Sequence, residues 1–455
     1  MNKKQRIKPI HFIPISFMVV ILVGAELLTM PFSSASFDET DFVTALFTST
    51  TSVCVTGLVV VDTFSYWSVI GQFIIMLLIQ IGGLGVVTVG ALVMYFAKMK
   101  FSLGNMIILE DSLNVDRKRE VGSFLFRVIR GVFIVEGIGA AIYCCEFIPK
   151  LGVAKGIWAS LFQSVSAFCN AGMDIVGPNS MIDFNSSPTS MVTTMLLIVF
   201  GGIGFVVWID IVDAIKEGIK KRFTPRNVIR RLSEHTKLVV VLTLALIVGG
   251  AICFFIAEFN NPDTMGDMDL GTKILNSFFQ SVTLRTAGFV SVPQDKLTEV
   301  SCLIGCILMF IGGSPVGTAG GVKTVTAFLV VMNAISYITR KNESVIYKRR
   351  VTSERMRKAA AIVLVNISIA LVMTILLLAT GDMSLTDASY EVFSAVGTVG
   401  VSRGLTPNLN IVGRLIIILS MFLGRIGPIS MAIFFTSGND ESSKISHSEG
   451  NFYVG

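Results

Sequence analysis

The chain has 455 residues, of which 52% are hydrophobic and only 15% are charged. Soluble domains carry about 25% charged residues, and the polar segments of this chain are short connectors, so the composition excludes a water-soluble protein and indicates an integral membrane protein. The net charge of +6 reflects how basic residues are distributed across a membrane and does not indicate nucleic-acid binding.

Eight segments are long and apolar enough to cross a membrane, which takes about 20 residues in a helix. In chain order they are 10–31, 67–97, 121–146, 188–215, 236–257, 298–337, 358–380 and 411–436. The sixth is too long for one crossing and is interrupted by Gly312-Gly313-Ser314-Pro315. The first follows a basic start, as a signal peptide does, but its length, the charged Glu26 and the lack of a clear cleavage site favour a retained helix.

Four further segments are half apolar and too short to span the membrane. They are 40–55, 155–169, 270–285 and 385–397. We interpret them as re-entrant helices, which enter and leave the membrane on the same side.

The basic residues predict how the chain crosses the membrane. Lys and Arg residues number 25 in the connectors 1–9, 98–120, 216–237 and 338–358. They number only 6 in the connectors that alternate with these, 32–66, 147–190, 258–297 and 381–410. Because basic loops stay in the cytoplasm, we expect a multi-pass protein of the bacterial plasma membrane with both termini cytoplasmic, and re-entrant helices that enter from outside. The outer connectors carry 14 acidic residues, which are either ordinary solvated charges or a mouth that concentrates cations.

An internal repeat supports this topology. Each re-entrant segment leads into a similar phrase of three residues: Val55-Thr56-Gly57 after Cys54, Asn170-Ala171-Gly172 after Cys169, Thr286-Ala287-Gly288 after Arg285, and Thr398-Val399-Gly400 after Gly397. A glycine pair or its remnant begins 25, 29, 24 and 24 residues after the last glycine of each phrase. The predicted fold is therefore an all-α integral membrane protein with four tandem helix–pore-loop–helix repeats around a central pore. The repeats occupy 1–98, 99–220, 221–340 and 341–436, and a cytoplasmic tail follows at 437–455.

Such an architecture suits a cation pathway. A short helix that enters from outside directs the negative end of its dipole at the membrane centre. The irregular backbone after it is tolerated only where it is buried in protein or lines a water-filled path. Four such stretches around one axis present rings of carbonyl oxygens that replace a cation's hydration shell, and glycine allows the backbone angles that this requires.

These motifs resemble the membrane subunits of the Trk/Ktr/HKT superfamily of potassium transporters, most of all the Ktr type (KtrB or KtrD), over residues 10–436. The resemblance implies an ion selectivity filter made by the backbone of Val55, Thr56, Gly57, Asn170, Ala171, Gly172, Thr286, Ala287, Gly288, Thr398, Val399 and Gly400. Glycine in all four repeats is similar to the potassium-selective members, whereas sodium-selective relatives carry serine in the first repeat. Only Thr398-Val399-Gly400 resembles the core of a potassium-channel filter, so we expect fewer ion sites and looser discrimination.

The interruption of the sixth span is a candidate gate. Segment 312–324 contains Gly312, Gly313, Ser314, Pro315, Gly317, Thr318, Gly320, Gly321 and Lys323. It does not fit a phosphate-binding loop, because Val322 separates Gly321 from Lys323 and no strand precedes it. It is either a flexible kink or an unwound loop below the filter, and the resemblance implies a movable gate.

Several charged residues lie in or near the membrane. Arg425 is expected at the depth of the gate, either in the pore or as a partner of loop carbonyls, and we favour the pore. Glu26 and Glu136 are either coupling sites for protons or sodium or partners of neighbouring helices. Asp62 and Asp174 follow their filter glycines as candidate mouth charges, and the resemblance implies that Arg285 braces its loop.

We expect no enzyme, no cofactor in this chain and no transition-metal site, because no HExxH motif, His/Asp cluster or Ser-His pair occurs in the spans. The resemblance implies a homodimer on a cytoplasmic octameric ring similar to KtrA or KtrC, which binds ATP or ADP and sets the gate. The basic loops 216–231 and 340–358 and the tail 437–455 are candidate contacts for the ring or for anionic membrane lipids.

The predicted function is uptake of K⁺ through a single-chain, channel-like pore gated by the ring, with stimulation by Na⁺ left open. The alternative is a sodium-permeable protein, or a symporter coupled to Na⁺ or H⁺, of the same superfamily. An alternating-access carrier would also use broken helices, but such carriers usually contain inverted repeats, whereas the loop charges give all four repeats one orientation.

Overall fold

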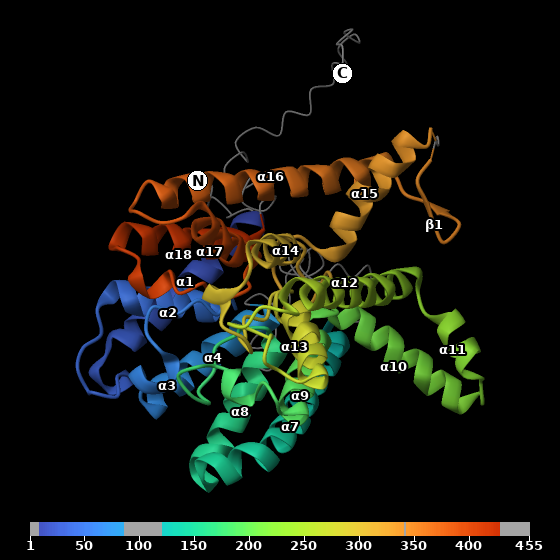
Figure 1. The fold of residues 1–455 in the computed structure, drawn as a ribbon. Helices are drawn as coiled ribbons and strands as arrows, with labels where there is room; N and C mark the ends of the chain where they lie inside the picture. The colour runs from blue at the N-terminus through green and yellow to red at the C-terminus, as the bar shows by residue number, and fades with distance from the viewer. Residues whose placement is uncertain (1–8, 86–120, 341–342, 428–455) are drawn as a thin grey trace, which may run out of the picture.

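The computed structural model describes residues 9–85, 121–340 and 343–427, and one order of helices recurs four times along it (Figure 1). The first group is α1 (Pro9–Thr29), η1 (Pro31–Ser33), α2 (Phe42–Val53), α3 (Thr63–Tyr66) and α4 (Val69–Leu84). The second is α7 (Val121–Leu151), α8 (Val153–Cys169), η2 (Ile182–Phe184), α9 (Pro188–Gly202) and α10 (Phe205–Lys220), followed by α11 (Pro225–Arg231). The third is α12 (Glu234–Glu258), α13 (Leu270–Thr283), η3 (Gln294–Lys296), α14 (Glu299–Phe310) and α15 (Thr324–Ile338). The fourth is α16 (Ser353–Leu378), α17 (Leu385–Gly397), η4 (Thr406–Asn408) and α18 (Ile411–Ile426), after the strands β1 (Val345–Ile346) and β2 (Arg349–Arg350).

The four groups close into a ring. In each group, the helix after the short one packs on the short helix of the next group: α4 on α8, α9 on α13, and α14 on α17. The last contact, α18 on α2, brings the end of the chain back to its start, and Figure 1 shows red α18 close to blue α2. The chain therefore surrounds a common centre.

Local sequence explains where these helices begin. The helices after the short ones start at equivalent caps: Ser68, Ser187, Thr298 and Asn410 each accept a backbone N–H three residues later. Such a side chain satisfies one of the free donors at a helix start. The short helices α2 and α13 are capped in the same way by Asp41 and Asp269.

Glycine and serine fix how each short helix packs on the long helix before it. A Cβ on Gly24, Gly139 or Gly250 would fall within 3.0 Å of a serine hydroxyl on the short helix. Those serines, Ser49, Ser164 and Ser281, donate to backbone carbonyls of α1, α7 and α12. Small residues allow such close approach between helices in membranes.

The outer surfaces of the long helices are apolar. Exposed side chains include Val23, Ile138, Ile252 and Leu364, which are 54% to 66% exposed. A soluble protein rarely exposes contiguous apolar faces of this kind, whereas lipid covers them in a membrane protein. The buried core instead contains large aromatic side chains such as Trp67, Tyr143 and Tyr390.

The predicted helices are present, but not all of the predicted spans are single helices. The four short helices expected from the sequence are α2, α8, α13 and α17. Among the described residues, three helices are long and apolar enough to cross a membrane: Phe124–Leu151, Glu234–Glu258 and Ser353–Leu378. Shorter apolar helices occupy other predicted spans, and the predicted ends at 86–97 and 428–436 lie outside the described residues.

Two predictions are wrong. The span 188–215 was expected as one helix, but α9 and α10 meet at 99°, because Gly204 has a φ of 97° and the Phe205 amide donates to the Val316 carbonyl at 2.8 Å. The fold is also not all-α, since β1 and β2 form an antiparallel hairpin. By contrast, the break predicted within 298–337 is present between α14 and α15.

Candidate ion filter and gate loop

The four predicted filter phrases share one unusual backbone. The residue two positions before each last glycine has a left-handed φ: 55° at Val55, 61° at Asn170, 73° at Thr286 and 51° at Thr398. The glycines have φ values of 100° at Gly57, 65° at Gly172, 86° at Gly288 and 103° at Gly400. Residues other than glycine rarely adopt positive φ, and such strain gathers at functional sites. Its recurrence in all four phrases indicates one shared purpose for this backbone.

The four glycines form a closed ring with the carbonyls of the phrases. A Cβ on Gly57 would lie less than 3.0 Å from the Ala171 carbonyl oxygen. In the same way, Gly172 faces the Ala287 carbonyl, Gly288 the Val399 carbonyl and Gly400 the Thr56 carbonyl. The phrase of each repeat thus packs against the phrase of the next repeat, and the phrase of the fourth repeat packs against that of the first. The structure brings together all twelve filter residues predicted from the sequence, and any side chain in place of a ring glycine would collide with a neighbouring carbonyl.

Hydroxyl groups at the ends of the short helices hold the phrases in place. The Gly57 amide donates to Thr51 Oγ1 at 2.9 Å, and the Gly400 amide donates to Ser394 Oγ at 3.0 Å. In the other two repeats, Ser166 Oγ donates to the Met173 carbonyl and Thr283 Oγ1 to the Phe289 carbonyl. Sequence reasoning missed these residues, although a Ser or Thr five or six positions before each glycine is a visible signal.

Two further hydroxyls in the filter are buried without a partner. Thr56 Oγ1 and Thr398 Oγ1 have no hydrogen-bond acceptor or donor among the described residues. A buried polar atom of this kind needs an explanation. Both hydroxyl oxygens therefore keep lone pairs that are free to accept a ligand, and Thr398 Oγ1 lies against Gly320.

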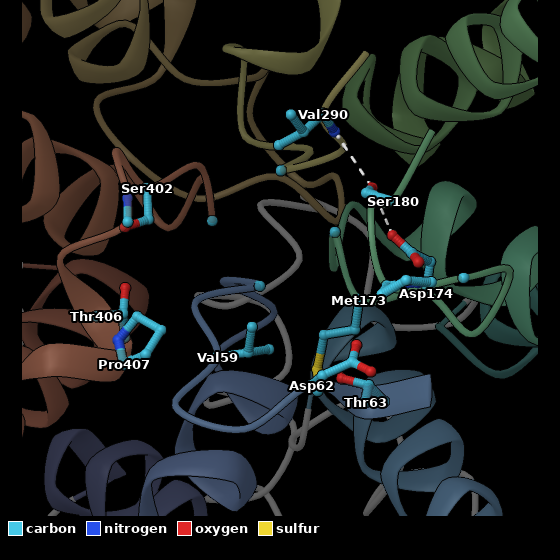
Figure 2. Close-up of a pocket in the computed structure, with 17 residues that line it drawn as sticks. Val59, Asp62, Thr63, Met173, Asp174, Ser180, Val290, Ser402, Thr406 and Pro407 are labelled. Atoms are coloured by element: carbon cyan, nitrogen blue, oxygen red, sulfur yellow. Dashed lines mark hydrogen bonds between the residues drawn. The ribbon is translucent and has the colours of Figure 1, made fainter. Parts of the chain in front are cut away.

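A cavity of about 210 Å³ opens onto the glycine ring and is lined by all four glycines (Figure 2). The predicted mouth residues Asp62 and Asp174 both lie in it, on the same side, and Ser402 and Thr406 lie across from them (Figure 2). Asp62 accepts from the Ser65 amide at 3.0 Å and caps α3. The mouth is therefore acidic on the side formed by the first two repeats.

Asp174 lies in the loop between α8 and α9 and is largely buried, with 9% of its surface exposed. Burial raises the pKa of this carboxyl to about 7, the hydrogen bond from Ser180 Oγ opposes the rise, and the charge of Asp62 adds to it. Ser180 also accepts from the Val290 amide at 3.4 Å. Because of its pKa, the carboxyl changes its charge close to neutral pH.

The predicted gate segment is a compact loop between α14 and α15. Ile311 and Val322 form a parallel bridge, in which the Gly312 amide donates to the Val322 carbonyl at 2.9 Å. The loop is also bound to the second repeat: the amides of Ser314 and Thr318 donate to the carbonyls of Gly202 and Gly201 at 2.9 and 3.1 Å. It is an ordered, hydrogen-bonded loop, and the alternative of a simple helix kink is excluded.

The loop lies against the end of the filter that faces away from the mouth. A Cβ on Gly320 would collide with the Thr398 hydroxyl, and one on Gly312 would come within 3.4 Å of the Thr286 methyl group. Both threonines are the first residues of their phrases, whereas the mouth is lined by the last. Lys323 Nζ donates to the carbonyls of Ala319 and Gly320 at 2.7 and 3.4 Å. The loop thus occupies the space next to the filter along its axis.

Arg425 connects the loop to two other repeats. Its Nη1 donates to the Thr318 carbonyl at 2.5 Å, and its Nη2 donates to the Gly82 carbonyl of α4. Among the described residues it forms no ion pair. Contact with a loop carbonyl, one of the two alternatives for this residue, is therefore present.

The other predicted charges differ in burial and in partners. Glu136 is 3% exposed and accepts from Gln80 Nε2 at 3.1 Å, beside Cys169, which precedes the second filter phrase. Glu26 is on the exposed side of α1. Arg285 is buried behind the third phrase. Within the described ranges, no group of three or more His, Cys, Asp or Glu residues is placed to bind a metal ion.

The sequence and the fold both match known cation transporters. Residues 7–445 match the family described as "TrkH: Cation transport protein". The chain is 35% identical over 432 residues to the potassium/sodium uptake protein NtpJ of Enterococcus hirae, covering 94% of this chain and 93% of that protein. It is 34% identical over 464 aligned positions to the Ktr system potassium uptake protein B of Bacillus subtilis, covering both chains completely.

The fold is similar to the crystal structure of the potassium transporter TrkH from Vibrio parahaemolyticus. The TM-score is 0.75 at 15% identity, and the match covers 96% of this chain and 86% of that chain. This likeness concerns the fold, whereas the sequence match to the family extends over most of the chain. The chain is a member of the TrkH family of cation transport proteins and not an enzyme.

Proposed function

We propose that this protein takes up K⁺ across the bacterial plasma membrane through a channel-like pore built from its four repeats. The observation that carries the proposal is the ring of four glycines, each packed on the carbonyl of the next phrase. A ring of carbonyl oxygens replaces the hydration shell of a cation without adding a charge that would hold it too tightly. The names of relatives that take up potassium, from Enterococcus hirae and Bacillus subtilis, support K⁺ as the ion.

In this proposal, the filter consists of the twelve residues of the four phrases. The backbone carbonyls of Thr56, Ala171, Ala287 and Val399 form its central ring, and the partnerless hydroxyls of Thr56 and Thr398 supply further oxygen ligands. Cations reach it from the mouth, where Asp62 and Asp174 raise their local concentration.

The loop between α14 and α15 is the gate. It lies against the inner end of the filter, and conduction requires it to move away. Its hydrogen bonds to Gly201, Gly202 and Arg425 hold it in the present position. Arg425 places a positive charge beside the path, which opposes the passage of a cation while the loop is packed.

The assembly and topology extend the proposal. Both termini are cytoplasmic, eight segments cross the membrane, and the short helices enter from outside, as the Lys and Arg distribution supports. Two copies form a dimer on a cytoplasmic ring that binds ATP or ADP. Two relatives, the Ktr system potassium uptake proteins B and D of Bacillus subtilis, are named as parts of a Ktr system, which supports further subunits.

One relative is named as a potassium/sodium uptake protein, and this keeps sodium permeation as the second candidate. Only one of the four phrases reads Thr-Val-Gly, so the ring has fewer matched oxygen ligands than a potassium-channel filter. Comparing rubidium and sodium uptake in the same cells distinguishes the two.

The test is rubidium uptake, and growth on limiting potassium, in bacteria that lack their own potassium uptake systems and express the ring subunit with this chain. Gly288→Asp is expected to abolish uptake, because its side chain would collide with the Val399 carbonyl. Gly381→Asp is the matched control, since no atom lies within 4 Å of the Cβ position there. Uptake by Gly288→Asp at the parental rate, or failure of the parent to take up either ion, would refute the proposal.

A further inference from the structure

Thr318 of the gate loop contacts three other parts of the chain through its three polar groups. Its amide donates to the Gly201 carbonyl of α9 at 3.1 Å, and its carbonyl accepts from Arg425 Nη1 of α18 at 2.5 Å. Its hydroxyl donates to the Phe168 carbonyl of α8 at 3.2 Å. Both Thr318 and Phe168 are fully buried. The first two contacts hold the loop in its packed position, and the third reaches the helix end that supports the filter.

The Phe168 carbonyl belongs to the last turn of α8, two residues before the second filter phrase. The last carbonyls of a helix have no amide partner within that helix. The amides that follow do not supply one here, because those of Asn170 and Ala171 donate to carbonyls earlier in α8. In the described ranges, the Thr318 hydroxyl therefore provides the hydrogen bond that the Phe168 carbonyl receives.

The gate loop gives the second repeat a hydrogen bond that the equivalent positions lack. In three repeats, the carbonyl four residues before the filter glycine packs on the first glycine of the following pair. A Cβ on that glycine would collide with the carbonyl oxygen in each case: Gly82 with Val53, Gly201 with Phe168 and Gly424 with Val396. Within the part of the chain that the structure describes, a side chain donates to this carbonyl in the second repeat alone. The loop thus supports one filter phrase directly.

The hydrogen bond from Thr318 restrains the peptide group that leads into the second phrase. Asn170, two residues after Phe168, has a left-handed φ of 61°, which residues other than glycine rarely adopt. Strain of this kind persists only where the surroundings hold the backbone in place. The Phe168 ring also packs edge-to-face on Trp208 of α10, with ring centroids 5.5 Å apart. When the gate loop moves, the carbonyl loses its donor and the phrase loses part of its support.

We propose that Thr318 is a positioning residue for the second filter phrase, which it supports only while the gate loop is packed. The filter therefore binds a cation more tightly under a packed loop than after the loop has moved, and opening of the gate helps the ion to leave. Coupling between two sites is reciprocal, so a cation in the filter also favours the packed loop. This coupling rests on the proposed cation filter, whichever alkali cation the filter conducts.

The test measures cation binding to the purified full-length protein through its melting temperature, which a bound ion raises. Rubidium chloride replaces N-methylglucamine chloride at constant ionic strength. We expect a saturable rise for the parent and a half-maximal rubidium concentration about fivefold higher for Thr318→Val, which loses one hydrogen bond. Thr318→Ser keeps the hydroxyl and should respond as the parent does.

Thr374→Val is the matched control. This threonine is also buried, and its hydroxyl also donates to a backbone carbonyl, that of Ala370 within α16. Its half-maximal rubidium concentration should equal that of the parent. A parental value for Thr318→Val overturns the proposal, and so does an equal increase in Thr318→Ser or in Thr374→Val.

A second measurement uses the parent alone, so that it does not depend on the folding of a variant. Hydrogen exchange of the gate-loop amides, including that of Thr318, should be slower in rubidium than in N-methylglucamine, and equal exchange overturns the proposal. If no alkali cation raises the melting temperature of the parent, the filter is refuted and this coupling with it. If sodium raises it and rubidium does not, the potassium proposal fails, and the same variants decide the coupling in sodium.

Discussion

Replacing Arg425 with glutamine should open the pore when the cytoplasmic ring is absent. The guanidinium donates to the Thr318 carbonyl of the gate loop and to the Gly82 carbonyl of α4. Glutamine removes the positive charge and is too short to reach both carbonyls. The packed loop therefore loses its connection to the first and fourth repeats, and the path loses one repelling charge.

The magnitude follows from the two hydrogen bonds. Each hydrogen bond from a charged donor contributes about 1.5–3 kcal/mol. When the loop moves away, hydrogen bonds to water replace part of these two hydrogen bonds. We therefore take the stabilisation that Arg425→Gln removes from the closed position as equal to one such hydrogen bond. The closed position is then destabilised by about 1.5–3 kcal/mol, which raises the open fraction about tenfold to a hundredfold where that fraction is small.

The assay is rubidium flux into liposomes that contain the purified chain without the ring subunit. Arg414→Gln is the control, because Arg414 is on the same helix and also donates to backbone carbonyls, those of Leu409 and Pro407, far from the gate loop. Flux should rise for Arg425→Gln and stay at the parental level for Arg414→Gln. Unchanged or reduced flux in a folded Arg425→Gln protein would refute the assignment of the loop and Arg425 to the gate.

Three further predictions concern the mouth, the filter and the packing. Asp174 has a pKa raised to about 7, so its carboxyl is neutral below that pH and negative above it. Rubidium uptake at low salt should therefore rise about fivefold from pH 6 to pH 8, because the negative charge attracts the cation by about 1 kcal/mol. Uptake by Asp174→Asn should stay low across this range. An equally steep pH profile in Asp174→Asn would assign the effect to another group. Thr51→Val removes the acceptor of the Gly57 amide and should lower the rubidium-to-sodium uptake ratio at unchanged expression; an unchanged ratio would show that this hydrogen bond does not shape the filter. Gly250→Ala places a methyl group against Ser281 Oγ and should destabilise the protein by about 1–3 kcal/mol, seen as a lower melting temperature; an unchanged melting temperature would mean that α12 and α13 separate without cost.

Much of the architecture was predictable because local signals and global fold agree. Segment 385–397 was expected as a short helix with these ends, and α17 has them. The apolar composition of the segment, the serine cap before it and the glycine-containing phrase after it all indicate the same helix boundaries. The filter phrases could be found for a similar reason, since a backbone that needs positive φ selects glycine at one fixed position in each repeat.

The features that were missed depend on contacts between distant parts of the chain. Gly201-Gly202 gives no local sign of a 99° bend. The bend is held by contacts with the distant gate loop, in which the Ser314 amide donates to the Gly202 carbonyl and the Phe205 amide donates to the Val316 carbonyl. The partners of Arg425 lie 107 and 343 residues away along the chain, so a sequence pattern indicates that a charge is buried but not what it contacts. The hairpin of β1 and β2 turns through Tyr347 and Lys348 with φ of 47° and 67°, without the Asn or Gly that usually announces such a turn.

The central claim is that the four carbonyls preceding the filter glycines form the cation site. The most direct test is to locate a heavy alkali ion in the protein. Crystals grown in rubidium chloride should show anomalous density on the axis between the carbonyl oxygens of Thr56, Ala171, Ala287 and Val399, and Gly288→Asp should lack it. Rubidium density confined to the mouth near Asp62 and Asp174, or present at the ring in Gly288→Asp, would contradict the account.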